Sequence, residues 1–254
     1  MKHIITALLS IFLIGFAVAQ DPADLAGAEG SQPNVLILLA DDRGWNDVGY
    51  NGSGIRTPHI DRLASEGVRL DQYYVYPTCS PSRVALLSGR PPSRWGILGP
   101  IAGTSTLALP PETETLPRIL GRAGYETAIS GKWHLGLRPE FGPWKYGLDH
   151  TYGSLHGQVD QYTHRYKYGD VTWHREGTFT EEEGHATDLI ANEAIEFLQS
   201  KRDKKRPFFL YVAHTFPHVP HYPSREGAGQ SDGGTYGDVV EDLTPGGDLL
   251  PLVV

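Results

Sequence analysis

Residues Asn34–Asp42 read "NVLILLADD", a continuous apolar run that ends at two adjacent aspartates. A short run that is apolar at every position is typical of a strand buried on both faces of a parallel sheet. We therefore expect such a strand from Asn34 to Ala40. Because ligands in these folds gather at the carboxyl ends of the strands, Asp41 and Asp42 stand where a functional site is expected.

Strand and helix signals alternate after this run. "TPHIDRLASEG" carries Thr57 as a helix N-cap, Pro58 at the first helical position and Gly67 as the stop. Further strands are predicted in "VRLDQYYVY" (68–76), "YETAIS" (125–130) and "RPFFLYVAH" (206–214), and further helices in "SPSRVALLSG" (80–89), "TLPRILGRAG" (115–124) and Glu181–Ser200. This alternation predicts an α/β fold with a mainly parallel central sheet sandwiched by helices.

The N-terminus has the features of an export signal. Lys2 and His3 precede the apolar stretch Ile4–Val18, which ends at small residues. This pattern predicts a secretory signal peptide over 1–19, followed by a flexible lead-in over 20–33. A membrane anchor is the alternative, but the stretch is short for a bilayer span, and no later segment is long and apolar enough for one. The protein is therefore expected to be secreted, periplasmic or lysosomal.

Composition limits the possible partners. Of the 254 residues, 39% are hydrophobic and 20% charged, which is typical of a globular protein, and the formal net charge is -8. Nucleic acids and anionic membrane surfaces bind to clustered lysine and arginine, so both are unexpected partners. An anionic substrate would need a local cationic site.

Cys79 is the single cysteine of the chain, which rules out an internal disulfide. It can be a small buried hydrophobic residue, a cysteine with its own chemistry, or half of an intermolecular bridge. Ser80 is a good N-cap and Pro81 suits the first helical position, so Cys79 is expected just outside a helix start. The backbone N–H groups there, with Arg83 in the first turn, favour a bound anion.

The adjacent carboxylates of Asp41 and Asp42 repel each other unless a cation lies between them. A hard divalent metal held through oxygens is one solution. A solvated turn with Arg43 as the counter-charge is the other. The residues alone leave both open.

Two histidine-containing stretches follow strands. In "GKWHLG" (131–136), Lys132 and His134 alternate along an extended segment, so both can face one side with Trp133 on the other. A cation and an imidazole on one face suit an anion site with a proton donor, although a surface lysine and a hydrogen-bonded histidine would look the same.

In "HTFPHVPH" (214–221), the histidine spacing suggests a zinc site, but Pro217 and Pro220 forbid the helix that such a site needs. We expect instead an extended loop that presents His218 between two prolines.

Taken together, these stretches resemble the sulfatase family. The "DD" at Asp41 and Asp42, "CSPSR" at 79–83 with "LLSGR" after it, "GKWHLG" and "FFLYVAHTFPHVP" occur in the family's order. The resemblance covers about Pro33–Pro223, and "YGLDHTYGSLHGQVDQYTH" (146–164) is most similar to the arylsulfatase B, I and J group. It implies an alkaline-phosphatase-like fold and hydrolysis of aryl or glycan sulfate esters.

The resemblance also implies a modification and a metal. Cys79 would be oxidised by a formylglycine-generating maturation enzyme to an aldehyde, formylglycine. One hydroxyl of the hydrated aldehyde attacks sulfur, and the other then expels sulfate. Asp41, Asp42 and the oxygen of residue 79 would bind Ca²⁺, with Mg²⁺ possible.

By the same resemblance, the basic residues take the remaining roles. Arg83 would orient the formylglycine. Lys132 and His218 would bind the sulfate and serve the leaving oxygen as acid, while His134 would assist proton removal.

The C-terminal part departs from the family pattern, which continues with an Asp-Asn pair, another lysine and a smaller second domain. We expect a partial catalytic domain over 34–223, a divergent, weakly ordered tail over 224–254 and an incomplete sheet with an exposed edge. The alternatives are an inactive fragment, a sulfated-glycan-binding pseudoenzyme, or a phosphatase or phosphodiesterase of the same fold. The last needs a serine or threonine nucleophile, for which Thr78, next to Cys79, is the candidate.

Overall fold

The computed structural model describes residues 30–167 and 169–243. The chain separates into two units, Met1–Pro33 and Asn34–Val254, and every helix and strand described below belongs to the second. The predicted signal peptide and most of the lead-in lie outside the described residues. None of the described helices combines the length and the hydropathy that a membrane crossing requires.

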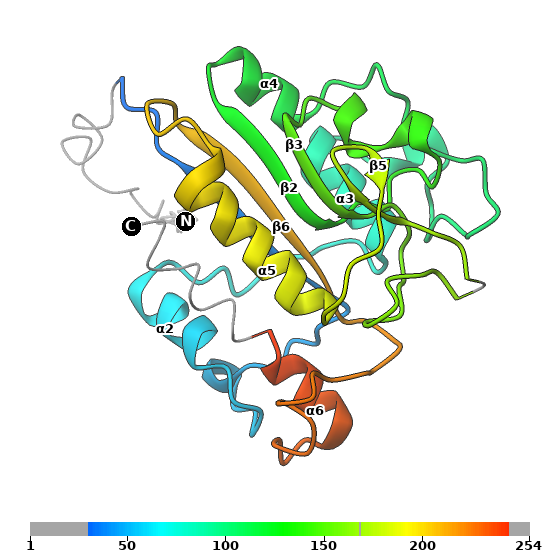
Figure 1. The fold of residues 1–254 in the computed structure, drawn as a ribbon. Coiled ribbons are helices and arrows are strands. Elements are labelled where there is room, and N and C mark those ends of the chain that lie inside the picture. Colours follow the sequence, from blue (N-terminus) through cyan, green and yellow to red (C-terminus); the bar gives the residue numbers. More distant parts are fainter. Residues whose placement is uncertain (1–29, 168, 244–254) are drawn as a thin grey trace, which may run out of the picture. The chain divides into compact units, whose positions relative to one another are not determined.

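Among the described residues, six strands form one mixed sheet in the order β1-β6-β2-β3-β4-β5 (Figure 1). Neighbours among the first four strands in this order are parallel, and β4 and β5 add two antiparallel pairs. The strands are β1 Val35–Asp41, β2 Glu126–Lys132, β3 His150–Ser154, β4 Trp173–Arg175, β5 Thr178–Phe179 and β6 Phe208–Pro217. The prediction of a mainly parallel sheet is confirmed.

Strand β6 is the centre of the core, because every one of its residues is buried. Its side chains alternate between two apolar clusters on opposite faces of the sheet, as the period of a strand requires. Phe209, Tyr211 and Ala213 enter one cluster, and Phe208, Leu210 and Val212 enter the other. A strand apolar on both faces must be covered on both, and this is why helices lie on each side.

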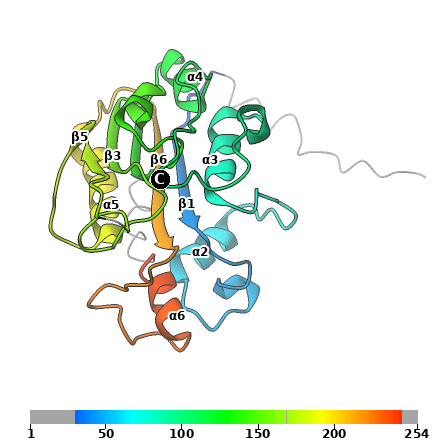
Figure 2. The ribbon, with the colours of Figure 1, turned by 90° about the vertical axis from the view of Figure 1, so that its right-hand side faces the viewer.

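Helix α5 (Ala186–Glu196) packs on one face of the sheet, and α3 (Cys79–Ser88) and α4 (Leu116–Arg122) lie on the other (Figure 2). The predicted sandwich of helices around the sheet is therefore confirmed. The remaining helices are α2 Pro58–Glu66 and α6 Gly234–Glu241, four short 3-10 turns at Gly49–Asn51, Pro92–Trp95, Pro139–Phe141 and Pro143–Lys145, and a π turn at Phe197–Lys201.

Local signals predicted some helix ends well. Helix α2 has Thr57 at its N-cap and Gly67 at its C-cap, as expected. Helix α5, in contrast, begins at Ala186 and not at Glu181. Gly184 has a φ of 134°, outside helical geometry, and Glu182 accepts a hydrogen bond from the Tyr152 hydroxyl. The backbone angle of Gly184 and the contact of Glu182 therefore keep the segment before Ala186 out of the helix.

Strand β1 differs from the expectation of burial on both faces. Among the described strands it pairs only with β6 and forms one edge of the sheet. Most of its residues are partly buried, and Leu38 is 40% exposed. Its apolar sequence predicted the strand correctly, but burial on the second face requires a neighbour that the described residues do not provide.

The second strand predicted over 68–76 does not form. The segment has no regular secondary structure, and its apolar side chains are exposed, from 40% at Tyr76 to 88% at Val68. Strand propensity reflects packing on a paired, half-buried surface more than an intrinsic backbone preference. No described strand lies beside this segment to supply that pairing.

The segment expected to be a weakly ordered tail contains helix α6. Val239 and Val240 of this helix are fully buried. The Asp238 carboxylate accepts hydrogen bonds from the backbone N–H groups of Gly229, Gln230 and Ser231, which fixes the preceding loop. The end of the tail, residues 244–254, lies outside the described residues.

Candidate functional site

The predicted site residues meet where three neighbouring parallel strands end. Asp41 closes β1, Lys132 closes β2, and His218 follows directly after β6. Because β6 lies between the other two strands and is parallel to both, these three ends fall on one edge of the sheet. Helix α3 begins with Cys79 and brings Arg83 to the same edge.

Asp41 forms a buried ion-pair cluster with two cations. Its carboxylate is bonded to Lys132 Nζ through one oxygen, and its other oxygen lies 3.4 Å from Arg83 Nη2. The three side chains are between 0% and 4% exposed. With two cations and one carboxylate, the cluster carries a net positive charge inside a protein whose total charge is negative.

Burial and mutual charge set the ionisation of this cluster. Burial alone would raise the pKa of Asp41, but the charges of Lys132 and Arg83 outweigh it and hold that pKa below its ordinary value. The pKa of Lys132 is lowered, first by burial and then by the nearby Arg83, against the opposing effect of Asp41. Lys132 is therefore a cation that gives up its proton more readily than a surface lysine.

Arg83 is fixed from one side and open on the other. Its Nη1 donates to the Lys132 carbonyl oxygen at 2.6 Å and to the Tyr211 hydroxyl at 3.1 Å. Its Nε and Nη2 make no hydrogen bond among the described residues, although both are buried and Nη2 lies 3.4 Å from the Asp41 carboxylate. Buried donors without partners are unfavourable, so these atoms indicate a polar ligand.

Cys79 is a free, buried thiol at the start of α3. It lies within electrostatic range of both Arg83 and Lys132. The expected cap was two residues off, since the helix begins at Cys79 itself and Thr78, not Ser80, is the N-cap. Ser80, predicted as the cap, instead accepts a hydrogen bond from the Ile101 backbone N–H through its hydroxyl oxygen at 3.1 Å.

His134 is held in one tautomer by the backbone of Ile101, the residue that also contacts Ser80. Its Nε2 donates to the Ile101 carbonyl oxygen at 3.0 Å, and its Nδ1 is buried and unpartnered among the described residues. Burial, followed by the charge of Lys132, lowers the pKa of His134 well below its ordinary value. A neutral imidazole that donates through Nε2 has its lone pair on Nδ1, so Nδ1 is the atom that can accept a proton.

His218 and Asp42 form a second, more exposed pair. The Asp42 side chain is 56% exposed, and its carboxylate lies 3.6 Å from His218 Nε2. His218 Nδ1 lies 2.6 Å from the Val219 carbonyl oxygen, so it donates to that oxygen. The two adjacent aspartates thus diverge. Asp41 faces the buried cations, whereas Asp42 faces the histidine at the surface.

Sequence reasoning missed three groups that position this site. The Tyr211 hydroxyl supports Arg83, the Ile101 backbone joins Ser80 to His134, and Gly157 leaves room for the His134 ring. A Cβ at Gly157 would lie 2.1 Å from His134 Cε1. Only Tyr211 had a signal in the sequence, since it alternates with Ala213 on one face of a predicted strand.

The described residues do not fit a complete calcium site. Asp41 is bonded to Lys132 and paired with Arg83, and Asp42 is turned toward the surface. No group of three or more His, Cys, Asp or Glu side chains arranged to hold a metal occurs within residues 30–167 and 169–243. Calcium takes roughly six to eight oxygen ligands, more than these two carboxylates and residue 79 supply.

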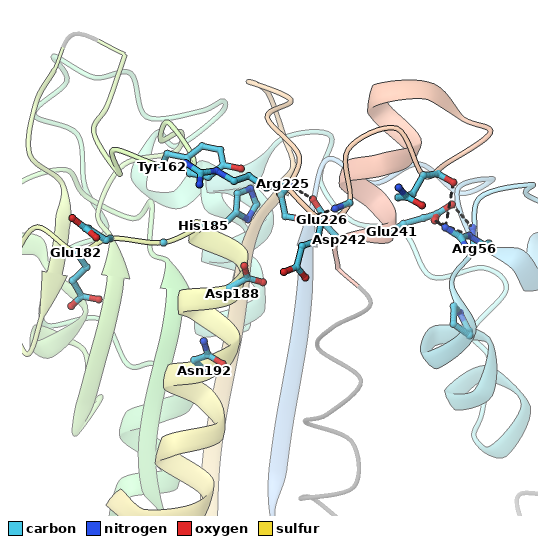
Figure 3. A pocket seen from close by; sticks show the side chains of 16 residues that line it. Arg56, Tyr162, Glu182, His185, Asp188, Asn192, Arg225, Glu226, Glu241 and Asp242 are labelled. Carbon is cyan, nitrogen blue, oxygen red and sulfur yellow. Dashed lines mark hydrogen bonds and ion pairs between the residues drawn. The ribbon is translucent and has the colours of Figure 1, made fainter.

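The same residues do fit an oxyanion. Two buried cations, the open Arg83 donors and the start of α3 all favour negative charge beside Cys79. A cavity of about 1170 Å³ lies elsewhere on the molecule, and none of these residues lines it (Figure 3). Its lining carries six carboxylates and two arginines, a balance that disfavours anions.

Fold and site together define an α/β protein with a buried, net positive cluster of charged side chains at the carboxyl edge of a mainly parallel sheet. The chain belongs to the sulfatase family, because the family model described as "Sulfatase" matches residues 33–238. This match confirms the resemblance that the sequence motifs indicated.

Known proteins similar to this chain are sulfatases. It is 39% identical to N-acetylgalactosamine-6-sulfatase of Mus musculus over 253 residues, covering 90% of this chain and 48% of the relative. It is 39% identical to arylsulfatase J of Mus musculus over 205 residues, covering 77% of this chain and 34% of the relative. The chain therefore spans about half or less of the length of these relatives.

A solved structure confirms the fold. The crystal structure of Ps i-CgsB in complex with k-i-k-neocarrahexaose superimposes with a TM-score of 0.78 at 31% sequence identity. The match covers 88% of this chain and 55% of that chain. The sheet described above is thus part of a sulfatase fold whose relatives continue beyond it.

Proposed function

We propose that the protein hydrolyses sulfate esters, with residue 79 as the nucleophile. The observation that carries this proposal is the buried cluster of Arg83, Lys132 and Asp41 beside Cys79, which has a net positive charge and unpartnered donors. Membership of the sulfatase family favours sulfate esters over phosphate esters as the substrate.

The proposal includes conversion of Cys79 to formylglycine by a maturation enzyme during export. A buried residue at a helix N-terminus, flanked by Arg83 and Lys132, suits a group that must carry negative oxygen. Once formed, the group supplies a hydrated aldehyde, of which one hydroxyl attacks sulfur and the other allows sulfate to be released.

The basic side chains bind and orient the ester. Arg83 offers Nε and Nη2 to the anion while Tyr211 and the Lys132 carbonyl oxygen hold its Nη1. Lys132 adds a second positive charge, and its side chain is fully buried. Electrostatic stabilisation by such preorganised, desolvated groups is commonly the largest single contribution to catalysis.

Two histidines divide the proton transfers. His134 is neutral and has a free lone pair on Nδ1, so it accepts the proton lost from residue 79. His218 lies at the rim of the site with its Nε2 toward solvent and Asp42, so it donates to the departing alcohol oxygen. This division of roles separates a fully buried base from a partly buried acid.

Calcium remains part of the proposal only by family resemblance. Asp41 and Asp42 would be its ligands, with further oxygen ligands needed beyond those described. For this reason, each step above relies on the protein's own side chains.

The substrate class that we propose is an aryl or glycan sulfate, handled by an exported protein that is secreted, periplasmic or lysosomal. The names of the relatives support this class, since one is a sulfatase of a sulfated amino sugar and one solved neighbour holds a carrageenan-type oligosaccharide. A polar active site with stacking aromatics nearby suits a sugar ring as well as an aryl group.

Hydrolysis of 4-nitrocatechol sulfate tests the proposal. The protein is produced together with a formylglycine-generating enzyme, and the Cys79→Ala variant is the matched control. We expect turnover by the wild type and none above background by the variant. Equal rates for the two proteins would contradict a role for residue 79.

Binding of sulfated glycans without turnover is the second candidate function, favoured by the small number of oxygen ligands for a metal within residues 30–167 and 169–243. Under this alternative, inorganic sulfate stabilises the protein against heat, but no sulfate ester is hydrolysed. The two measurements together separate an enzyme from a binding protein.

A further inference from the structure

Helix α6 contacts both loops that carry the more exposed part of the site. One loop follows β1 and begins with Asp42, and the other follows β6 and begins with His218. Figure 2 shows α6 between these two loops. The helix is anchored by Val239 and Val240, which are fully buried. Its polar side chains are therefore presented to the loops from a fixed position.

Tyr236 joins α6 to the loop after β1. Its hydroxyl donates to Asp47 Oδ2 at 2.5 Å. The same oxygen accepts a hydrogen bond from the Gly44 backbone N–H at 2.6 Å, and Gly44 is two residues beyond Asp42. Burial, followed by the hydrogen bond to Asp47, raises the pKa of Tyr236 to about 12, so the hydroxyl keeps its proton and remains the donor. The loop that carries Asp42 is thus bonded to the helix.

The ring of Tyr236 contacts the loop after β6. It packs against the His221 ring in a T-shaped arrangement, with the ring centroids 5.4 Å apart. Edge-to-face contact is a favoured arrangement for aromatic rings. His221 is three residues beyond His218. One side chain therefore reaches both loops, one through its hydroxyl and the other through its ring.

Two carboxylates at the end of α6 repeat this connection. Glu241 accepts hydrogen bonds from the backbone N–H and the Nε of Arg56, at 3.1 and 2.8 Å, on the segment that follows β1 (Figure 3). Asp242 accepts hydrogen bonds from the backbone N–H and the hydroxyl of Ser224, at 2.6 and 2.8 Å, on the segment that follows β6. The helix is therefore bonded to both segments near its end as well as through Tyr236.

These contacts affect the pair formed by Asp42 and His218. The Asp42 carboxylate lies 3.6 Å from His218 Nε2, and the two residues belong to different loops. Their separation depends on how the loops are held relative to each other. Because the Asp42 side chain is 56% exposed, packing around it contributes little to that separation.

We propose that helix α6 clamps the two loops at the rim of the site and that Tyr236 is a positioning residue, which keeps His218 directed at the alcohol oxygen that leaves the ester. The proposal rests on the proposed function for the role of His218 as the acid. Tyr236 acts through the two loops and not on the ester itself.

The dependence of kcat/KM on the leaving group tests this role. A misplaced acid slows the loss of a poor leaving group, which needs a proton, more than the loss of a good one. The two substrates are phenyl sulfate and 4-nitrocatechol sulfate, of which the first has the poorer leaving group. We expect Tyr236→Phe to lower kcat/KM about tenfold for phenyl sulfate and less than about twofold for 4-nitrocatechol sulfate.

Tyr152→Phe is the matched control. It removes a hydroxyl that likewise donates to a carboxylate at 2.5 Å, that of Glu182, but from strand β3 and away from both loops. We expect this variant to leave the ratio of the two kcat/KM values as it is in the wild type.

Hydrogen–deuterium exchange tests the clamp without turnover. Tyr236→Phe should speed exchange about fivefold in the loop 42–51, the effect of losing one hydrogen bond. Tyr236→Ala also removes the ring and should speed exchange in the loop 217–223 as well. Tyr152→Phe should leave both loops at the wild-type rates.

An equal loss of kcat/KM for the two substrates in Tyr236→Phe would overturn the positioning role, and wild-type exchange in both loops of Tyr236→Ala would overturn the clamp. Faster exchange in both loops of Tyr236→Ala, in a protein whose wild type hydrolyses neither substrate, would support the clamp and contradict the proposed function. Turnover by the wild type, with wild-type kcat/KM for both substrates in Tyr236→Phe, would support the proposed function and contradict the role of Tyr236.

Discussion

Asp41 balances the charge of the site, since its carboxylate is paired with both buried cations, Lys132 and Arg83. The Asp41→Asn substitution keeps its shape and removes its charge. We expect the free energy of unfolding to fall by about 3 to 5 kcal/mol, as for other buried ion pairs that lose one partner. Urea denaturation measures this loss.

The adjacent Asp42→Asn variant is the control, because that side chain is 56% exposed and should change stability by less than about 1 kcal/mol. Similar losses for the two variants would show that Asp41 has no special role in the balance of charge.

Tyr211 is the positioning residue most open to test. Tyr211→Phe removes the hydroxyl that accepts from Arg83 Nη1. We expect about 1 kcal/mol less stability and a kcat about tenfold lower, because the guanidinium is less well aimed. Tyr146→Phe is matched, since it removes a buried hydroxyl that donates to the Leu109 carbonyl oxygen and not to a residue of the site. A kcat that falls equally in both variants would contradict a positioning role.

At the residue scale, the sequence indicated which side chains gather at this edge of the sheet, but not how they are arranged there. Cys79, Arg83, Lys132 and His134 could be found because each follows a strand or begins a helix and has a reactive or charged side chain. The Tyr211 contact could not be predicted, since it depends on which face of β6 meets α3. The opposite directions of the two aspartate side chains also could not be predicted, because they depend on the backbone conformation of Asp42, which has a φ of 65°.

At the element scale, β1 presents an unpaired edge among the described strands. Its residues Val35–Ala40 include no charge and no proline, the usual features that protect such an edge. We expect the protein to self-associate through this edge at micromolar concentration and Leu38→Lys to reduce the association. Light scattering after gel filtration measures it.

Leu98→Lys is the control for this edge, because Leu98 is 76% exposed and lies outside the sheet. An equal effect of both substitutions would indicate a general gain in solubility and not protection of the edge.

Elements with local signals were predicted well, and those that depend on neighbours were not. Strands β2 and β6 and helices α2 and α4 follow from apolar runs, caps and glycine stops. The segment 68–76 has the composition of a strand, yet it does not form one, because no described strand pairs with it. The predicted start of α5 was wrong for a related reason. It depends on a tertiary contact of Glu182, which no local sequence pattern indicates.

At the scale of the whole molecule, buried histidines link stability to pH. Burial lowers the pKa of His174 and of His214 to about 4. In the unfolded chain each histidine binds a proton near pH 6.5, so between pH 6.5 and 4 the unfolded state binds more protons than the folded state. Stability therefore falls as the pH falls through this window, by about 3 kcal/mol for each histidine at pH 4.

Urea unfolding at a series of pH values measures this dependence. His214→Phe should flatten the profile, because the substitution removes one titrating group from the buried strand β6. His59→Phe, at a partly exposed position on α2, should leave the profile as steep as in the wild type. A wild-type stability that stays constant from pH 6.5 to 4 would contradict the account of these histidines.

The central claim is that residue 79 acts as formylglycine in a site built for a sulfate ester. The most direct measurement is the mass of the tryptic peptide Leu70–Arg83, taken from protein produced together with a formylglycine-generating enzyme. A known sulfatase from the same cells serves as the positive control. We predict the lower mass of the aldehyde in place of the thiol at Cys79. An unmodified cysteine in this peptide, with the control sulfatase converted, would contradict the claim.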